Sequence, residues 1–321
     1  MIFAYRPSET GLERVPGGGD PGDELRAALW VDLLSPQPAQ VAAVEALGIS
    51  VPTLADMQEI EVSNRLYRDG NTEVLTIVLP GLDKHKEPTF GPVAFLITPE
   101  RLFTVRYHTP RPFETFAAHA GQSSAGYSGR RRVFLGLIEE IVARIADLLE
   151  GVGEALDQQS HVTFRDPEPR GDELADTLRA LGRQSEQVAK YRHALLTVER
   201  ALSSFGLGLE SDKEKGLREV LKAQVKDCQA LAVHGDFLSS RIAQLTDVTL
   251  GLINLEQSVA SRILSVVAVL FLPPTLVASV YGMNFPFIPG LDHPYGYLIA
   301  TVLMIGSALG TYLLSKWKKW L

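Results

Sequence analysis

Two runs of residues without a charged side chain lie near the C-terminal end of the chain, and they constrain its fold more than any other feature. The runs are Ile263–Val280 and Tyr297–Leu314, each 18 residues long. As helices rising about 1.5 Å per residue, each would extend roughly 27 Å, just enough to cross the hydrocarbon core of a bilayer. Aromatic residues at their edges are typical of membrane spans. The sequence therefore predicts two transmembrane helices.

The charges around these runs predict their orientation. Arg262 precedes the first run, and Lys316, Lys318 and Lys319 follow the second. The connecting residues 282–296 contain no Lys or Arg. Because positive charge collects on the cytoplasmic side, we expect both termini in the cytoplasm and the connection outside. The N-terminus lacks the features of a signal peptide. We expect a multi-pass protein of the inner or plasma membrane, in contact with the lipid bilayer.

The composition of residues 1–260 narrows the function. This part has 27 basic and 37 acidic residues, a formal balance of −10. Such a balance argues against nucleic acid as a partner and is compatible with cations. The single cysteine, Cys228, excludes a Cys-rich zinc site and fits a small buried side chain. No catalytic motif or phosphate loop appears, and the seven histidines form no i, i+4 pair. We therefore expect that the protein is not an enzyme and has no cofactor.

The first 110 residues show the patterns of an α/β domain. Strand-like runs occupy 2–6, 28–34, 73–82 and 93–107, the last with a hairpin turn at Pro99. Helices are predicted over 37–49, ending at Gly48, and over 54–70, ending at Asp69 and Gly70. Strands and helices alternate in this region.

Long helices follow. Residues 133–156 and about 173–205 form a predicted helical hairpin, and Ser211–Glu214 has the form of a capping box that opens a third helix. No proline interrupts this third helix before Pro273, so it can run into the membrane over a length on the order of 100 Å. The expected layout is an α/β domain (1–130), a hairpin (131–210), a stalk helix (211–262), a first span (263–281), a loop (282–296), a second span (297–315) and a basic tail (316–321).

Small and polar residues form a row along the third helix, in steps of three and four. The row comprises Ser258, Ser261, Ser265, Ala268, Leu272, Thr275, Ser279 and Gly282. Such spacing places them on one side of the helix. Close helix packing and the lining of a water-filled path both explain it. A single stripe cannot enclose a path, so a path would require an oligomer around an axis.

If the row lines a path, six residues of the first span are its candidate lining. They are Leu264, Ser265, Ala268, Leu272, Thr275 and Ser279. Leu264 and Leu272 would then form hydrophobic constrictions able to close by dewetting. The amide of Asn284 would lie at the outer mouth, where it can accept hydrogen bonds from ion-bound water.

A short motif links these features to a known family. Tyr281–Phe285 reads Tyr-Gly-Met-Asn-Phe, lies between the two terminal runs, and is followed at the end by Lys-Trp-Lys-Lys-Trp-Leu; this resembles the CorA magnesium transporters. Trp30–Leu33 and Glu59–Tyr67 also resemble that family's cytoplasmic domain. The resemblance implies an α+β membrane protein with an N-terminal α/β/α cytoplasmic domain. A long stalk helix continues as the pore-lining span, and the oligomer is a funnel-shaped homopentamer.

The resemblance also implies a function. Gly282, Met283 and Asn284 match the family's selectivity filter. Mg²⁺ gives up its water reluctantly, so a ring of neutral amides suits the hydrated ion. Family members close when cytosolic Mg²⁺ bridges acidic groups between protomers. The resemblance therefore implies Mg²⁺ influx gated from the cytoplasm.

Two departures from the family concern acidic residues. The loop reads Ile-Pro-Gly-Leu at 288–291 where the family often has an acid, which leaves only Asp292 in this loop. A regulatory acidic position of the family falls on Ala223, with Glu219 and Asp227 each one turn away as candidates.

Other functions stay open at this point. Co²⁺ and Ni²⁺ are alternative passengers of the same path. A ZntB-like Zn²⁺ transporter shares the architecture, although Met283 favours magnesium. A membrane-anchored scaffold without ion flux is an alternative of another class. No ionisable residue lies inside either span, which favours a channel over a proton-coupled pump.

Overall fold

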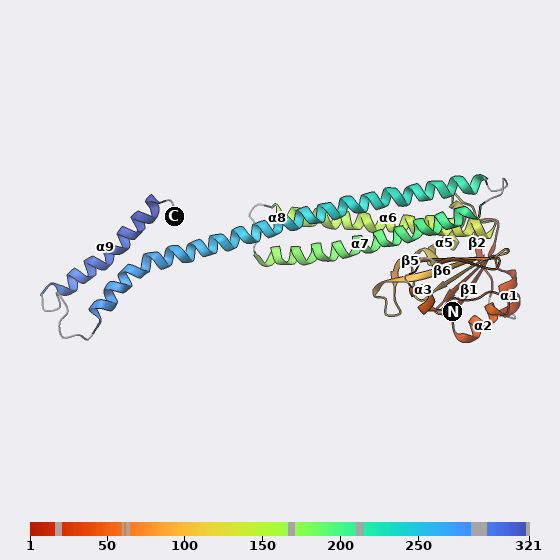
Figure 1. Cartoon of the computed structure of the whole chain (residues 1–321), viewed down its shortest axis with the longest axis horizontal. Coiled ribbons are helices and arrows are strands. Elements are labelled where there is room, and N and C mark those ends of the chain that lie inside the picture. The colour runs from red at the N-terminus through yellow and green to blue at the C-terminus, as the bar shows by residue number, and fades with distance from the viewer. Residues whose placement is uncertain are drawn as a thin grey trace. The chain divides into compact units, whose positions relative to one another are not determined.

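The computed structural model in Figure 1 describes residues 1–16, 21–59, 61, 65–165, 171–209, 215–283 and 294–318. The chain divides into two compact units. The first unit comprises Met1–Arg165 and Thr177–Leu245, and the second comprises Asp166–Asp176 and Thr246–Leu321.

A seven-stranded sheet forms the centre of the first unit. Its order is β2-β1-β3-β7-β6-β5-β4, and every neighbouring pair is antiparallel except β3 and β7. The strands are β1 (Ile2–Pro7), β2 (Leu12–Arg14), β3 (Trp30–Leu34), β4 (Leu66–Asp69), β5 (Thr72–Leu82), β6 (Pro88–Ile97) and β7 (Leu102–Arg106). The parallel pair joins strands about 70 residues apart, aligning Trp30 with Leu102. Such a pairing cannot be read from local sequence patterns.

Helices cover both faces of this sheet, because alternate side chains of its strands point to opposite sides. Trp30 and Phe95 belong to one core, together with α5 (Pro112–His119) and α6 (Arg130–Thr163). Val31 and Phe103 belong to a second core on the other face. Three short helices contribute to this second core: α1 (Pro21–Ala27), α2 (Pro38–Glu45) and α3 (Leu54–Gln58). The expected α/β/α layering is confirmed.

The predicted helix over 54–70 is wrong in its second half. Helix α3 ends at Gln58, and Leu66–Asp69 is instead strand β4, which pairs with β5 so that Asp69 faces Thr72. Gly70 adopts a positive φ of 56° in the turn between them. Asp-Gly is a strong signal for a tight hairpin turn, and the sequence interpretation treated the same pair as a helix end. Residues 60 and 62–64 lie outside the described part of the chain.

Three long helices of the first unit lie side by side in Figure 1: α6, α7 (Gly171–Leu207) and the first part of α8 (Lys215–Tyr281). Phe134 of α6 and Phe205 of α7 have ring centroids 4.8 Å apart. Gln224 of α8 donates from Nε2 to the carbonyl of Leu135 at 2.8 Å. Helices α6 and α7 occupy the range of the expected helical hairpin, and Cys228 is buried, as expected. The predicted capping box at 211–214 lies outside the described residues.

The second unit contains the C-terminal part of α8 and helix α9 (Gly296–Trp317). With 67 residues, α8 is on the order of 100 Å long. Among the described residues, α8 and α9 are the two helices long and apolar enough to cross a membrane.

Candidate functional site

The six candidate lining residues lie along one side of α8, and all six are exposed. We call this set the polar row: Leu264, Ser265, Ala268, Leu272, Thr275 and Ser279. All six are exposed in the second unit, and Leu264 and Leu272 reach 71% and 73%. No described element of this unit covers the row. The row is therefore exposed in the single chain.

The opposite side of α8 is the covered one. Within the span, the half-buried residues are Val266, Leu270, Pro273, Pro274, Val277 and Tyr281. At about 100° per residue, these positions lie roughly opposite to the polar row. The two prolines, which remove backbone N–H donors from the helix, are on this covered side.

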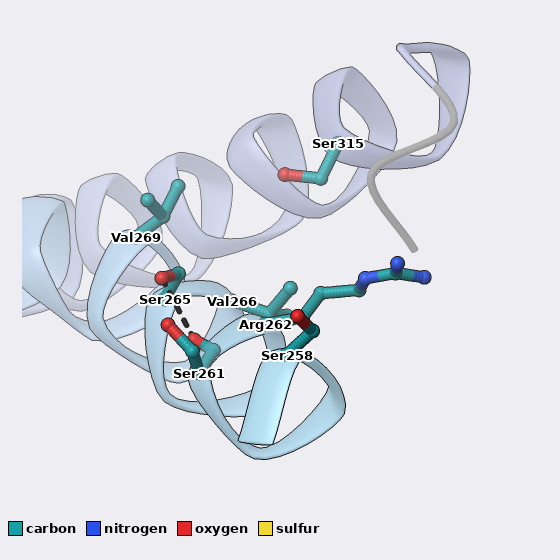
Figure 2. A pocket seen from close by; sticks show the side chains of 7 residues that line it. All are labelled: Ser258, Ser261, Arg262, Ser265, Val266, Val269 and Ser315. Carbon is teal, nitrogen blue, oxygen red and sulfur yellow. Dashed lines mark hydrogen bonds between the residues drawn. The ribbon is translucent and has the colours of Figure 1, made fainter. Parts of the chain in front are cut away.

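Helix α9 carries a matching stripe of small residues. Its buried and half-buried positions are Gly296, Ala300, Thr301, Met304, Ser307, Ala308, Thr311 and Ser315. Small residues at this spacing let helices approach closely in lipid. Figure 2 shows Ser315 of α9 across from Val266 and Val269 of α8, around a cavity of about 530 Å³. The sequence interpretation missed this stripe, although its spacing of three and four was visible.

The same cavity reaches one end of the polar row. Ser261 and Ser265 border it, together with Ser258 and Arg262. Ser265 donates from Oγ to the carbonyl of Ser261 at 2.9 Å, the bond dashed in Figure 2. Arg262 supplies a positive charge at this end of the span.

Two hydroxyls of the row, those of Ser265 and Thr275, donate to carbonyl groups within the helix. Thr275 Oγ1 donates to the carbonyl of Phe271 at 2.7 Å, as Ser265 does to Ser261. A hydroxyl that donates backward keeps its oxygen lone pairs as acceptors. Exposed acceptor oxygens on an uncharged helix face suit hydrogen bonds from ion-bound water.

The predicted filter begins where α8 ends. Gly282 N–H donates to the carbonyl of Ala278 at 2.9 Å, and Met283 N–H donates to that of Val280 at 3.3 Å. A Cβ on Gly282 would lie 3.1 Å from the Ala278 oxygen, closer than ordinary contact, so glycine keeps this turn tight. Met283 is half exposed. Asn284 and Asp292 lie outside the described residues.

The stalk candidates do not gather into a metal site in one chain. Glu219, Ala223 and Asp227 are all exposed on α8. Among the described residues, no group of three His, Cys, Asp or Glu side chains could hold a metal ion. A role for Glu219 or Asp227 stays a prediction, and it would need ligands from another protomer.

The first unit has its own polar centre, which the sequence interpretation did not single out. Asp32 and Arg106 face each other across the parallel strands and are only 1% and 3% exposed. Arg106 donates from Nη2 to Asp32 Oδ2 at 2.8 Å and from Nε to the same carboxylate. Thr104 donates to Asp32 at 2.7 Å and accepts from Trp30 Nε1. This network is closed and satisfied, so its role is structural.

His108 lies next to this network. Burial lowers the pKa of His108 to about 4, and the neighbouring Arg106 acts in the same direction. Its Nε2 donates to the carbonyl of Leu79 at 3.0 Å, which opposes the shift. The ring fits against Gly81 and Gly91, where a Cβ would come within 2.8 Å of it. His108 is a neutral core residue, as the sequence interpretation of ordinary histidines allows.

Comparison with known proteins shows which proteins this chain is similar to. The family described as CorA-like Mg²⁺ transporter protein matches residues 26–316. Magnesium transport protein CorA of Pectobacterium atrosepticum is 34% identical over 324 residues, covering 100% of both chains. The complete structure of the CorA magnesium transporter from Methanocaldococcus jannaschii aligns with a TM-score of 0.75 at 16% identity, over 100% of this chain and 99% of that one. The ZntB cytoplasmic domain of Vibrio parahaemolyticus aligns with a TM-score of 0.57 at 12% identity, over 80% and 97%.

Fold and apolar helices together define a membrane protein with an α/β/α domain, a long helix that continues into a span, and a second C-terminal span. The match over nearly the whole sequence is more specific. The chain belongs to the CorA-like Mg²⁺ transporter family.

Proposed function

We propose that the chain forms a channel that admits Mg²⁺ to the cytoplasm, with the polar row of α8 lining the ion path. The observation that carries this proposal is that the row is exposed and lies opposite the covered side of α8. Hydroxyls facing lipid would be unfavourable, whereas hydroxyls facing a shared aqueous axis are hydrated. A path of this kind also accounts for the position of every Ser and Thr in the span.

The channel is an oligomer, because one chain cannot enclose a path with a single row. Rotational symmetry turns each residue of the row into a ring. Family membership supports a homopentamer. Thr275 then contributes a ring of hydroxyls, while Leu264 and Leu272 contribute apolar rings that exclude water when they narrow.

At the outer end, Gly282, Met283 and Asn284 form the filter. A ring of Asn284 amides holds the hydrated ion through its water shell, which suits a cation that dehydrates reluctantly. The tight turn at Gly282 supports this role, because it starts the filter directly at the end of the lining helix. Asp292 is the acid of the outer loop that can attract cations.

At the inner end, cytosolic Mg²⁺ closes the channel by bridging acidic groups of neighbouring protomers. The balance of −10 in residues 1–260 supports this control. Glu219 and Asp227 are the candidate ligands on the stalk. Both termini lie in the cytoplasm, and the membrane is the plasma membrane.

Magnesium is the proposed cargo because the curated relatives carry that name and because Met283 is retained. The fold does not separate the ions, since a ZntB domain shares it. Zn²⁺, Co²⁺ and Ni²⁺ are therefore compared directly in the test.

The test is ion uptake into liposomes reconstituted with the purified full-length protein. Mg²⁺ entry should be saturable, fall when internal Mg²⁺ is high, and drop at least tenfold in Asn284→Ala. Ser203→Ala is the control, because Ser203 is an exposed residue of α7 that donates only to the carbonyl of Glu199 within its own helix.

Other outcomes would change the proposal. Zn²⁺ entry with little Mg²⁺ entry would assign the chain to zinc transport. Full Mg²⁺ entry in Asn284→Ala would show that Asn284 is not part of the filter. No flux of any of these ions through the assembled oligomer would favour a scaffold.

A further inference from the structure

The cavity between α8 and α9 has a polar lining, although these two helices carry the apolar stretches of the chain. Its volume is about 530 Å³, which is the size of a small-molecule site. Val266 and Val269 form an apolar wall. The other lining residues carry a hydroxyl group or a positive charge: Ser258, Ser261, Arg262, Ser265 and Ser315. All of these residues belong to the second unit.

Ser315 is the residue of α9 that lines this cavity. It is only 6% exposed, and Figure 2 shows its hydroxyl directed into the space between the two helices. Within the described part of the chain, Ser315 Oγ has no hydrogen-bond partner. Ser307 of the same helix instead donates to the carbonyl of Met304 at 2.9 Å. Because a buried hydroxyl without a partner is unfavourable, Ser315 indicates a ligand atom in the cavity.

The α8 side of the cavity offers further hydrogen-bond donors. Ser258, Ser261 and Arg262 are all exposed. Among the described residues, the two hydroxyls form no side-chain hydrogen bond and Arg262 forms no ion pair. A hydroxyl has one proton to donate, and a guanidinium group has five. The described lining therefore combines donors from both helices with one positive charge and no carboxylate. Such a lining favours an anion with several acceptor oxygens.

No acidic side chain lies close to Arg262 along these helices. The sequence has no Asp or Glu from Gln257 to Leu291, and none over 293–321. The nearest acid before Arg262 is Glu256, six positions earlier and about 120° around the axis of α8. A Cβ on Gly171 would lie 2.7 Å from Glu256 Oε2, so this carboxylate lies at the start of α7. Arg262 therefore has no acidic partner among the described residues.

The cavity lies at the boundary of the charge-free run on both helices. On α8, Arg262 directly precedes the run 263–280, and on α9, Ser315 directly follows the run 297–314. The ends of such runs lie at the depth of the lipid headgroups. Val266 and Val269 lie inside the run of α8. A molecule with an anionic head and an apolar body matches this order of lining residues.

We propose that this cavity binds the phosphate group of an anionic phospholipid. The phosphate accepts hydrogen bonds from the side chains of Ser258, Arg262 and Ser315. The glycerol backbone and the acyl chains lie against Val266 and Val269. Guanidinium N–H groups match phosphate oxygens in pairs, and basic pockets between membrane helices bind anionic headgroups. In the orientation proposed above, the lipid comes from the cytoplasmic leaflet. The site binds a lipid and not the transported ion, so it goes beyond the channel proposal.

The test is titration of the full-length protein in detergent with phosphatidylglycerol, read by native mass spectrometry as lipid bound per chain. Binding should be saturable and about tenfold or more tighter than that of zwitterionic phosphatidylcholine, because Arg262 has no acidic partner. Inorganic phosphate should not displace the lipid, since it has no apolar body. Binding should weaken about tenfold or more in Arg262→Gln and about fivefold or more in Ser315→Ala, because each removes hydrogen bonds to a charged group.

Each variant has a matched control that should bind as the parent does. Ser307→Ala also removes a hydroxyl from α9, but this hydroxyl donates to a carbonyl of its own helix and lies outside the cavity lining. Lys318→Gln removes a positive charge that follows the run of α9 and is likewise outside the lining. Melting temperatures of Ser315→Ala and Ser307→Ala should agree, which separates loss of a lipid contact from loss of folding.

Several results would overturn the proposal. One is the absence of saturable phosphatidylglycerol binding, and another is equal binding in the parent, Arg262→Gln and Ser315→Ala. An equal loss in Lys318→Gln and Arg262→Gln would assign the binding to general surface charge and not to the cavity. Displacement by inorganic phosphate would make the ligand a free anion. Binding is read without ion flux, so its failure is distinct from failure of the channel proposal.

Discussion

The polar side chains in the sheet of the first unit and those in the polar row of α8 have opposite surroundings. Asp32 and Arg106 are almost fully buried, and the hydrogen bonds of their network end on groups of the same chain. Ser265 and Thr275 instead lie on an exposed face of an apolar helix. Their hydroxyl protons are donated to carbonyls of the same helix, and their oxygen lone pairs are exposed as acceptors. The first arrangement is complete in one chain, whereas in the proposed channel the second is completed by further copies of the chain.

This difference separates structural polarity from functional polarity. A buried ion pair is stable only while both partners remain, because each alone would be a desolvated charge. An exposed hydroxyl in a span costs little to remove from the single chain, since it has no partner outside its own helix there. In the proposed channel, its value arises when symmetry surrounds it with water and other copies. Substitutions in the two regions should therefore affect different measurements.

The largest effect is expected at the buried pair. Asp32→Asn removes the negative charge and leaves Arg106 charged in the core. Breaking a buried pair in this way costs about 3–5 kcal/mol. We expect that loss in the free energy of unfolding, measured by denaturant titration of the first unit's circular dichroism signal in the full-length protein. The double variant Asp32→Asn with Arg106→Met should cost less than the single one, and an equal or larger cost would contradict the interpretation.

The next effect concerns His108 and acid. Its pKa is about 4 in the folded chain, against roughly 6.5 in the unfolded one. Between these values the unfolded state binds a proton that the folded state does not, so stability falls as pH drops from 6.5 to 4. The loss over this window is roughly 3 kcal/mol, and none of it occurs above pH 7.

The check for His108 is a pair of stability curves between pH 7.5 and 4. His108→Gln has no titrating ring, so its curve should be flatter than that of the parent by about this amount. Carboxyl groups contribute equally to both curves and cancel in the difference. Parallel curves would show that His108 has the same pKa in the folded and unfolded chain.

Sequence patterns predicted the parts of this molecule that depend on local periodicity. The two charge-free runs became the apolar segments of α8 and α9, and the steps of three and four in the row placed its residues on one exposed side. The assignment of this row to an ion path, and of Asn284 to a filter, stays a prediction. It depends on copies of the chain that one sequence does not describe.

What local patterns did not predict depends on distant pairing or on ambiguous turns. Asp32 and Arg106 meet because β3 and β7 are parallel neighbours, a pairing set by the whole sheet. Gly70 closes a hairpin rather than a helix, and the dipeptide Asp69-Gly70 is compatible with both until β5 is known to pair back. The stripe on α9 was readable, because Gly296, Ala300 and Ser307 already show its spacing.

A smaller effect tests the polar row against its covered neighbour. Thr275 and Thr301 both donate to a carbonyl one turn earlier, at 2.7 and 2.8 Å, but Thr275 is on the exposed row and Thr301 on the half-buried stripe of α9. Thr275→Ala should lower Mg²⁺ uptake about two- to fivefold, equivalent to roughly 0.4–1 kcal/mol in the barrier. Thr301→Ala should leave uptake near the parent value. A larger loss in Thr301→Ala than in Thr275→Ala would contradict the proposal, because it would mean that the ion path runs along the α9 stripe and not along the polar row.

The smallest effect is expected at an exposed pair of similar geometry. Arg192 Nη2 lies 2.6 Å from Asp236 Oδ1, closer than the 2.8 Å of the buried pair, yet these side chains are 44% and 58% exposed. Exposed pairs contribute at most about 1 kcal/mol, because water screens both charges. Asp236→Asn should change the unfolding free energy by less than about 0.5 kcal/mol, measured as for Asp32→Asn. Both changes replace one oxygen by an amide nitrogen, so the two losses compare a buried, multiply hydrogen-bonded carboxylate with an exposed one. Similar losses at the two sites would mean that distance, and not burial, sets the strength of these pairs.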